Sequence, residues 1–455
     1  MTLPQITIAG AGPVGALVAA LLARQGHEVT IYESREDPRR AGFKGGRSIN
    51  FSLTERGFHA LEVAGVRASA ERFAIPMRGR MVHHLNREPE LHKYGRDQKA
   101  QLHSINRGTL TMMLLDVAEK AGAKVFFQHK ITDVEFLADE VRISFSRGDG
   151  TTSRQTVPFI LGADGAGSRL RAAMNEVTDL GETVDRLHYG YKELQIPARV
   201  ENTGDPFLID GRALHLWPRG DYLTTALPNI SGSFTATLFM PLEGDSSFTT
   251  LNTGAKVRSF FDREFPSLSA LLPDLESEFF ANPTGSLATL HLRRWHLDRR
   301  ALLIGDAAHA ILPFHGQGMN CGFEDATELA ALFQRDMDVR EKFARFEQQR
   351  RPNTEAIAAM SLDNFTELRS RVREPGYRLR DELRHLLAVR HPERFLSRYE
   401  LVSFTRVPYA EARERGNVQE RLLRELTVTA ERLAEVDIPR ADRLITSQLP
   451  LLATR

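Results

Sequence analysis

The segment that most limits how this chain can fold lies at its start. "QITIAGAGPVGALVAALLARQGHEVTIYESR" (residues 5–35) has a β-prone run, a glycine turn, a helical stripe and a second β-prone run. Gly10, Gly12 and Gly15 form G-x-G-x-x-G, and Glu33 follows Gly15 by 18 residues. Glycines so spaced permit a tight turn, close approach to a pyrophosphate and close helix–strand packing. We expect a dinucleotide-binding βαβ unit with Glu33 on the ribose hydroxyls. The plainer alternative is a glycine-rich turn without a ligand.

Two later segments are also rich in glycine. "FILGADGAGSRLR" (residues 159–171) is an apolar strand followed by an Asp and glycines, and "GDAAHAILPFHGQGMNCGFEDA" (residues 305–326) follows another apolar run. A backbone that approaches something flat or anionic needs glycines near a helix start, where the helix dipole attracts negative charge. An NAD dehydrogenase needs only the first of the three segments, so the combination favours a different dinucleotide enzyme.

The pattern of strands and helices predicts an α/β frame with an α+β insertion. Strand-like runs separated by Pro, Gly and Asn turns fill residues 185–290, and the chain is helical from Glu324 onward. Leu422, Leu426, Ala430 and Leu433 form one stripe of a predicted helix. The predicted units are a discontinuous nucleotide domain (1–75, 101–184 and 291–330), a substrate domain with an antiparallel sheet (76–100 and 185–290) and a C-terminal helical region (331–455) that closes the pocket.

Composition excludes several other classes. The 455 residues carry a formal net charge of +1, so no field of the whole chain favours nucleic acid or an anionic membrane. The single cysteine, Cys321, can form no intrachain disulfide and is expected to be packed and inert. No apolar run reaches the roughly 20 residues of a membrane span, so we expect a cytoplasmic protein. The histidines show no ligand spacing, so no metal site is expected.

These motifs together resemble the FAD-dependent aromatic hydroxylases. Within that class, the closer resemblance is to the kynurenine 3-monooxygenase family, on "GRSINFSLTERG", "MRGRMVH", "YGYKELQIP", "LHLWPRGDY", "GDAAHAILPFHGQGMNCGFEDA" and "RYELVSFTRVPYAEA". The resemblance runs from the first strand to about Ala412. Pro13-Val14 between the glycines and Phe51-Ser52 depart from the family pattern. The membrane-associated tail of eukaryotic members has no counterpart, which suggests the soluble bacterial type.

The resemblance implies a monooxygenase of tryptophan catabolism that hydroxylates L-kynurenine at C3. Non-covalent FAD would be reduced by transiently docked NADPH and would take up O2 as a C4a-hydroperoxide, which the electron-rich ring attacks. The implied partner is therefore the small molecule L-kynurenine. We expect a monomer or homodimer.

The resemblance also implies residues for the substrate. Arg80, Tyr94, Asn364 and Tyr399 match the head-group contacts, and a guanidinium suits a carboxylate because it offers two parallel donors. Phe239 and Phe314 match the ring pocket, although Phe239 could equally be ordinary core. His315 and Gln317 lie beside Phe314 at the expected flavin face. His315 could bond the substrate carbonyl, or it could have a purely structural bond. His309 is expected to pack within its own turn.

The predicted FAD-binding residues come from all three glycine-rich segments and the loops near them. They are Gly10, Gly12, Val14, Gly15, Glu33, Ser34, Arg35, Arg47, Ser52, Arg107, Ile131, Asp164, Arg169, Asp306, Gly318, Met319 and Asn320.

Two alternatives remain open. A relative that hydroxylates a substituted kynurenine or another aryl amino acid would keep the head-group residues and change the ring pocket. A flavoprotein that oxygenates nothing is the other, and the intact run Pro313-Phe314-His315-Gly316-Gln317 argues against it.

Overall fold

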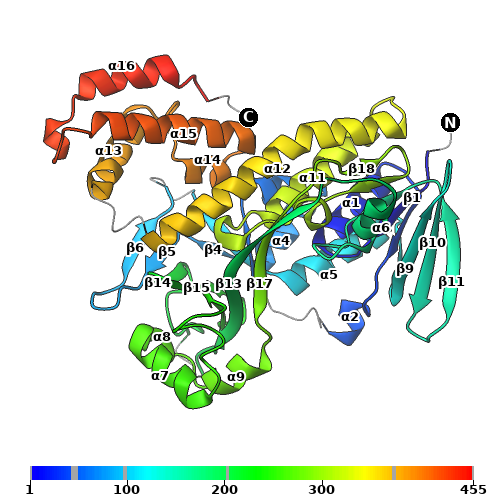
Figure 1. Ribbon diagram of the computed structural model, residues 1–455, viewed down its shortest axis with the longest axis horizontal. Helices are drawn as coiled ribbons and strands as arrows, with labels where there is room; N and C mark the ends of the chain where they lie inside the picture. The colour runs from blue at the N-terminus through cyan, green and yellow to red at the C-terminus, as the bar shows by residue number, and fades with distance from the viewer. Residues whose placement is uncertain (1–2, 43–49, 96–99, 201–203, 371–375, 453–455) are drawn as a thin grey trace.

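A computed structural model describes residues 3–42, 50–95, 100–200, 204–370 and 376–452. Figure 1 shows a nucleotide-binding part on the right, a second sheet in the lower centre and a group of C-terminal helices at the upper left. This arrangement confirms the predicted α/β frame with an inserted sheet and a helical C-terminal region.

The central sheet of the nucleotide-binding part is built from short strands with buried side chains. Its order is β18-β19-β12-β1-β2-β8. β1 pairs in parallel with β2 on one side and β12 on the other, so the chain reverses direction across the sheet at β1. Ligands of open α/β sheets bind at the carboxyl end of the strand where this reversal occurs. The strands are β1 Ile6–Ala9, β2 Val29–Tyr32, β8 Lys124–Phe126, β12 Ile160–Gly162, β18 His296–Leu297 and β19 Ala301–Leu303.

Helix α1 (Pro13–Arg24) is buried on nearly every side, because α5 (Arg107–Lys120) and α11 (Gly318–Phe333) both pack against it. The glycine-rich turns before α1 and α11 are thereby brought together. The other helices of this part are α2 Pro38–Ala41, α3 Glu55–Val63, α4 Arg67–Phe73, α6 Arg169–Val177 and α10 Asp306–His309, with a 3-10 turn, η1, at Pro313–His315.

Two three-stranded sheets flank the central sheet, in the orders β3-β7-β4 and β11-β10-β9. Their strands are β3 Asn50–Leu53, β4 Ala74–Met77, β7 Leu102–Asn106, β9 His129–Phe136, β10 Val141–Arg147 and β11 Thr152–Val157.

The second large sheet has seven strands in the order β17-β13-β16-β15-β14-β5-β6. All its pairs are antiparallel except β14 with β5, which are parallel because β5 arrives from the first part of the chain. The strands are β5 Gly79–Val82, β6 Glu90–Lys93, β13 Thr183–Ile196, β14 Leu214–Arg219, β15 Tyr222–Pro228, β16 Phe234–Pro241 and β17 Gly285–His291, and helices α7 Gly254–Glu264, α8 Pro266–Ser269 and α9 Leu275–Ala281 accompany them.

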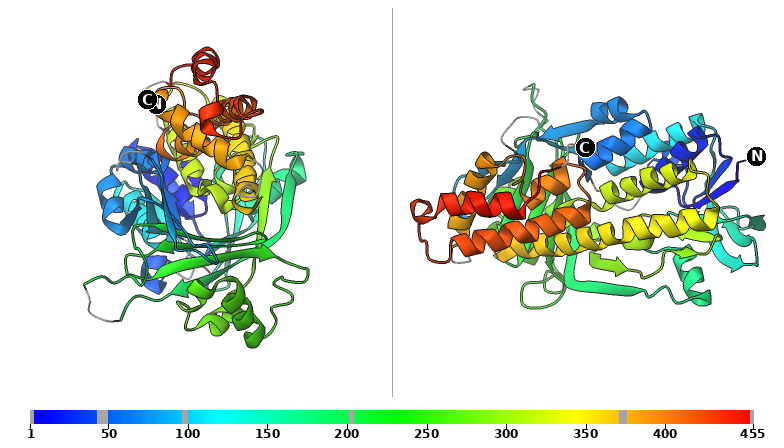
Figure 2. Two further views of the ribbon diagram at one scale, coloured as in Figure 1. Left: turned by 90° about the vertical axis from the view of Figure 1, so that its left-hand side faces the viewer. Right: turned by 90° about the horizontal axis from the view of Figure 1, so that it is seen from above.

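The long helix α12 (Val339–Ser370) joins the parts, because it contacts α11, β14, β15 and β18. Figure 2 shows it running beside α15 (Tyr409–Leu426). The remaining elements are α13 Tyr377–Arg390, α14 Arg398–Phe404, the 3-10 turn η3 Leu433–Glu435 and α16 Ile438–Gln448. Within the described parts of the chain, no helix has the length and apolar character that crossing a bilayer requires.

The predicted helical stripe near the C-terminus is only half right. Leu422 and Leu426 are buried in α15, but the helix ends at Leu426, so Ala430 and Leu433 belong to the turn that follows. Thr427 lies at this end, and its hydroxyl donates to the carbonyl of Leu423. Ala430 and Leu433 still pack against the same hydrophobic cluster. The apolar pattern therefore predicted correctly which residues are buried, but not where the helix ends.

Candidate active site

The three glycines of the first turn differ in what surrounds them. Gly10 has φ +94°, and a Cβ there would lie 2.5 Å from the carbonyl oxygen of Ala163. A Cβ at Gly15 would lie 2.1 Å from the carbonyl oxygen of Gly10, so this glycine lets α1 pack on β1. A Cβ at Gly12 would meet no protein atom within 4 Å. The first and third glycines serve the fold, and the second borders open space where a ligand could approach.

The helix starts beside this space lack side-chain caps. No side chain caps the N-terminus of α1 or of α11, whereas Asn106 caps α5 and Ser168 caps α6. Val14 lies against both Gly305 and Gly322, where a Cβ would come within 3.3 Å and 2.6 Å of its methyl groups. Two uncapped helix starts therefore lie close together, and each favours an anion.

Glu33 lies at the end of β2 and is 5% exposed. Its carboxylate accepts hydrogen bonds from the backbone of Ala11 at 2.9 Å and from the backbone and guanidinium of Arg35. Burial alone would raise the pKa of Glu33, but the bonds from Arg35 outweigh it and hold the pKa below its ordinary value. Glu33 is thus an anionic acceptor beside the glycine turn. The hydroxyl of Ser34 also donates to it, at 3.2 Å.

Asp306 follows β19 and has an exposed side chain. Its pKa is nevertheless raised by burial, against the opposing charges of His309 and Arg107. The carboxylate is therefore accessible although protein surrounds much of it. Burial lowers the pKa of Arg107, which also feels the charge of Arg35. Asp306 also lies beside the start of α11, since a Cβ at Gly318 would lie 3.9 Å from its Oδ1.

Other predicted cofactor residues take supporting positions. Asp164 accepts from the backbone amides of Arg169 at 2.8 Å and Leu170 at 3.2 Å, so it holds the start of α6, while its other oxygen is buried without a partner. Arg169 is exposed and donates to the carbonyl of Thr132. Ile131 lies on β9 and packs against the core. Arg47 lies outside the described residues.

Asn320 joins α11 to β3. Its amide nitrogen donates to the carbonyls of Ser52 at 2.8 Å and Gly316 at 2.9 Å, and its oxygen accepts from the amide of Thr54 at 3.1 Å. The side chain is fully used within the protein, so Asn320 could meet a cofactor only through its backbone. Ser52 lies beside Gly316, Gly318 begins α11, and Met319 packs in the core.

The predicted head-group residues do come together. The guanidinium of Arg80, on β5, lies 4.1 Å from the ring centre of Tyr399 and 5.9 Å from that of Tyr94. The two tyrosine rings stack with centres 5.8 Å apart. Among the residues that the structure describes, no carboxylate pairs with Arg80, and the buried hydroxyl of Tyr94 has no hydrogen-bond partner. The charge of Arg80 thus has tyrosine hydroxyls beside it and no acidic counterpart, and such a site favours an anionic ligand.

His315 lies against the same cluster. Its ring stacks on Tyr399 with centres 5.4 Å apart, and its Nδ1 is buried without a partner. Burial, reinforced by the charge of Arg80, lowers the pKa of His315 to about 3. The imidazole is therefore neutral at pH 7 and has one nitrogen free for a ligand.

The predicted aromatic pocket lies beside His315. The ring of Phe314 lies 5.0 Å from Phe239 and stacks on Phe365 at 4.4 Å. Asn364 donates through Nδ2 to the carbonyl of Phe314 at 2.6 Å. Its nitrogen is thus committed to η1, and only its oxygen stays available for a head group. Two aromatic residues that the sequence did not single out join this cluster, Phe365 and Tyr191. Phe365 follows Asn364 in the chain, and Tyr191 lies within the quoted "YGYKELQIP".

Gln317 is fully buried, and both polar atoms of its side chain are bound within the protein. Its oxygen accepts from the hydroxyl of Tyr409 at 2.8 Å and its nitrogen donates to the carbonyl of His315 at 3.4 Å. These bonds favour a supporting role over direct contact with a substrate.

His309 and Cys321 have protein partners. His309, Cys321 and Asp325 offer ligand atoms within 4.8 Å of one another. The guanidinium of Arg350 lies among them, with bonds to Asp325 at 2.7 Å and to the sulfur of Cys321 at 3.4 Å, so a cation already fills this place. Burial raises the pKa of Cys321, which keeps the thiol protonated.

These residues fit FAD. The open space at Gly12, the unpaired oxygen of Asp164, the uncapped helix starts and the acids Glu33 and Asp306 line one region, as a pyrophosphate between two polar groups requires.

Comparison with known proteins agrees. Residues 4–188 and 272–361 match the family described as "FAD binding domain". The chain is 46% identical over 449 residues to kynurenine 3-monooxygenase of Stenotrophomonas maltophilia (strain K279a), covering 98% of this chain and 97% of that protein. It is 45% identical over 446 residues to kynurenine 3-monooxygenase of Xanthomonas euvesicatoria pv. vesicatoria (strain 85-10), with coverage of 98% and 97%.

Known structures share the fold at lower identity. Pseudomonas aeruginosa PqsL, in complex with 2-aminobenzoylacetate, superposes with a TM-score of 0.64 at 22% identity over 82% of this chain and 99% of that chain. A tetrameric form of 2-methyl-3-hydroxypyridine-5-carboxylic acid oxygenase gives 0.64 at 18% identity over 83% and 95%. The sequence matches over nearly the full length decide the assignment: the chain belongs to the kynurenine 3-monooxygenase family of FAD-dependent enzymes.

Proposed function

We propose that this protein hydroxylates L-kynurenine at C3 to 3-hydroxy-L-kynurenine, with FAD as cofactor and NADPH and O2 as co-substrates. The observation that carries the proposal is the Arg80 cluster, in which a guanidinium without an acidic partner lies beside an unpaired tyrosine hydroxyl and a neutral histidine. An amino-acid carboxylate next to an aromatic ketone has the matching chemistry.

FAD would lie across the carboxyl end of β1. The backbone around Gly12 and the start of α1 would hold the pyrophosphate, Glu33 the adenosine ribose, and Asp306 the ribityl chain. When bound, FAD accepts a hydride from NADPH and activates O2. The start of α11 has no side-chain cap, so it would favour the negative charge that a reduced flavin carries.

Each head-group residue has a separate task. Arg80 offers two parallel donors to the substrate carboxylate, and the hydroxyls of Tyr94 and Tyr399 add neutral bonds that set its orientation. The side-chain oxygen of Asn364 can accept from the substrate ammonium group, because the nitrogen is held by Phe314.

The pocket for the aminophenyl ring is apolar. Phe239 and Phe314 would face the ring and exclude water, which protects the activated oxygen. His315, neutral and with Nδ1 free, can hydrogen-bond the substrate carbonyl. Gln317 would hold η1 and so act through His315.

The direct test follows both co-substrates. FAD-loaded protein is incubated with NADPH, 18O2 and L-kynurenine, and product mass and NADPH oxidation are measured. We expect one 18O atom in 3-hydroxykynurenine and faster NADPH oxidation with substrate than without it. A panel of ring-substituted kynurenines runs in parallel. A product from a substituted compound alone would move the proposal to that substrate, and NADPH oxidation without any hydroxylated product would refute a hydroxylase. Light scattering tests the expected monomer or homodimer.

A further inference from the structure

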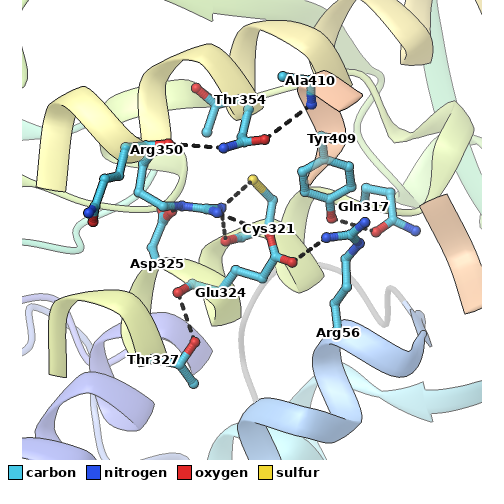
Figure 3. Close-up of polar contacts among 12 residues, drawn as sticks. Arg56, Gln317, Cys321, Glu324, Asp325, Thr327, Arg350, Thr354, Tyr409 and Ala410 are labelled. Carbon is cyan, nitrogen blue, oxygen red and sulfur yellow. Dashed lines mark hydrogen bonds and ion pairs between the residues drawn. The ribbon is translucent and has the colours of Figure 1, made fainter. Parts of the chain in front are cut away.

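A buried network of charges lies behind the site. Arg56, 1% exposed, pairs with Glu324, which also pairs with Arg350 at 3.1 Å. Arg350, 5% exposed, pairs with Asp325 at 2.7 Å. Figure 3 shows these side chains between the helices that carry them. None of them was singled out from the sequence.

One end of the network holds the C-terminal helices. The guanidinium of Arg56 donates to the carbonyl of Val402 at 3.1 Å and to that of Val407. It also stacks on the ring of Tyr409, 3.9 Å from its centre. A single arginine thus fixes both ends of the link between α14, which carries Tyr399, and α15, which begins at Tyr409.

Tyr409 carries this contact to the candidate site. The side chain is fully buried, and its hydroxyl donates to Gln317 Oε1 at 2.8 Å. Gln317 in turn donates to the carbonyl of His315, and its own carbonyl accepts from the amide of Cys321 at 2.8 Å. Gln317 therefore links η1 to α11, and Tyr409 is the partner outside those two elements (Figure 3).

Neighbouring residues of the turn are held by other C-terminal side chains. Asn364 binds the carbonyl of Phe314, Phe365 stacks on its ring, and Tyr399 stacks on His315. The C-terminal region thus contacts Phe314, His315 and Gln317. Within the turn, the backbone amide of Gly316 donates to the carbonyl of Pro313 at 2.9 Å. A turn of only three residues takes much of its shape from the neighbours that hold it.

We propose that Tyr409, clamped by Arg56, is a positioning residue that holds the 313–317 turn through Gln317 and so fixes His315 against the substrate. The inference rests on the proposed function for the part that concerns substrate, but the hold on the turn is a property of the protein alone. A small misplacement of a positioned group lowers kcat strongly even when the group itself is unchanged.

The variant Tyr409→Phe tests this, because it keeps the ring under Arg56 and removes only the hydroxyl. The matched control is Tyr32→Phe, since Tyr32 also donates its hydroxyl to a glutamine oxygen, that of Gln155, away from the turn. Hydrogen exchange is followed on FAD-loaded protein. We expect amides of residues 314–318 to exchange about tenfold faster in Tyr409→Phe, and at the wild-type rate in Tyr32→Phe. Equal protection in Tyr409→Phe and wild type would overturn the proposal.

Kinetics gives the second readout. In Tyr409→Phe, kcat for hydroxylation should fall about tenfold, while the Kd of L-kynurenine, set mainly by Arg80, stays within about threefold of wild type. More NADPH should be oxidised without product. A loss confined to Kd would contradict positioning of the turn. If wild-type protein hydroxylates nothing, the proposed function fails. Hydrogen exchange then tests by itself whether Tyr409 holds the 313–317 turn.

A double-mutant cycle decides whether the one bond carries the effect. Gln317→Met removes the acceptor, and the double variant with Tyr409→Phe should be no worse than Gln317→Met alone in both readouts. Additive losses would mean that Tyr409 acts by another route and would refute the proposed link.

Discussion

Two groups of arginines lie close to the candidate site, and they have opposite surroundings. Arg56 pairs with the largely buried Glu324, and Arg350 pairs with Glu324 and the fully buried Asp325, so protein carboxylates balance both charges. Arg80 has tyrosine rings around it and no carboxylate among the described residues. Both arrangements place a cation away from water, which is costly unless the charge is compensated. Protein carboxylates compensate the charges of Arg56 and Arg350, which serve the fold. The charge of Arg80 must be compensated by a ligand.

The largest expected effect breaks the paired group. Arg350→Met leaves Asp325, which is 0% exposed, without its guanidinium. Removing one partner of a buried ion pair costs about 3–5 kcal/mol of the free energy of unfolding. Urea unfolding of apoprotein measures it. Arg80→Met is the control and should lose no stability, because no partner is stranded. Equal losses in the two variants would erase the distinction between the groups.

The same substitution at Arg80 should act on catalysis instead. Arg80→Met strands the substrate carboxylate, so kcat/KM for L-kynurenine should fall by about 2–5 kcal/mol in free energy, which is more than tenfold. Arg80→Lys should recover only part, because a point charge lacks two parallel donors. FAD content, read by absorbance, should not change. Near-normal kcat/KM in Arg80→Met would place the carboxylate elsewhere.

Acid should lower the stability of the protein through His315, beside Arg80, and through Asp325, beside Arg350, in different pH ranges. Burial lowers the pKa of His315 to about 3, so between an unfolded pKa of about 6.5 and pH 3 the unfolded chain binds a proton that the folded protein excludes. Stability therefore falls by about 1.4 kcal/mol per pH unit as pH drops through this range. Asp325 has a pKa held far below 3.8 by His309 and Arg350 against the effect of burial, so its contribution is complete above about pH 5 and is lost only below it.

Urea unfolding of apoprotein at several values between pH 7 and pH 5 separates these effects. His315→Gln should remove one proton from the slope of stability against pH. His83 also has a pKa lowered to about 3, mainly by burial, so His83→Gln is a matched control that should change the slope equally without touching the turn. An unchanged slope in His315→Gln would mean that the imidazole is protonated or solvated in the folded protein.

The contrast also separates what sequence could predict from what it could not. Gly10, Gly12, Gly15 and Glu33 belong to one contiguous βαβ unit, so local chemistry predicted their positions. The structure gives steric reasons for Gly10 and Gly15, and it leaves Gly12 beside open space. Arg80, Tyr94 and Tyr399 come from segments far apart in the chain. The resemblance to a family brought them together, and no periodicity could.

The paired network gave no signal in the sequence. With 60 Lys and Arg and 59 Asp and Glu in the chain, nothing marks Arg56, Glu324, Asp325 and Arg350 as the buried ones. The sequence also does not show which polar side chains form hydrogen bonds within the protein. Gln317, Asn320 and Asn364 were predicted to face ligands, and each has polar atoms bound within the protein. Such hydrogen bonds depend on tertiary packing, and the local sequence does not encode them.

The smallest expected effects lie in the hydroxyls around Arg80. Tyr94→Phe removes a buried hydroxyl that has no partner in the protein, so stability should stay the same or rise slightly. Tyr399→Phe keeps the ring on Arg80 and His315 and removes only a neutral donor. Each should lower kcat/KM by about 0.5–1.5 kcal/mol, or two- to tenfold, at unchanged FAD content. If Tyr94→Phe instead destabilises the protein while kcat/KM is preserved, the hydroxyl serves the fold, and the Arg80 cluster would belong with the paired arginines and not with a binding site.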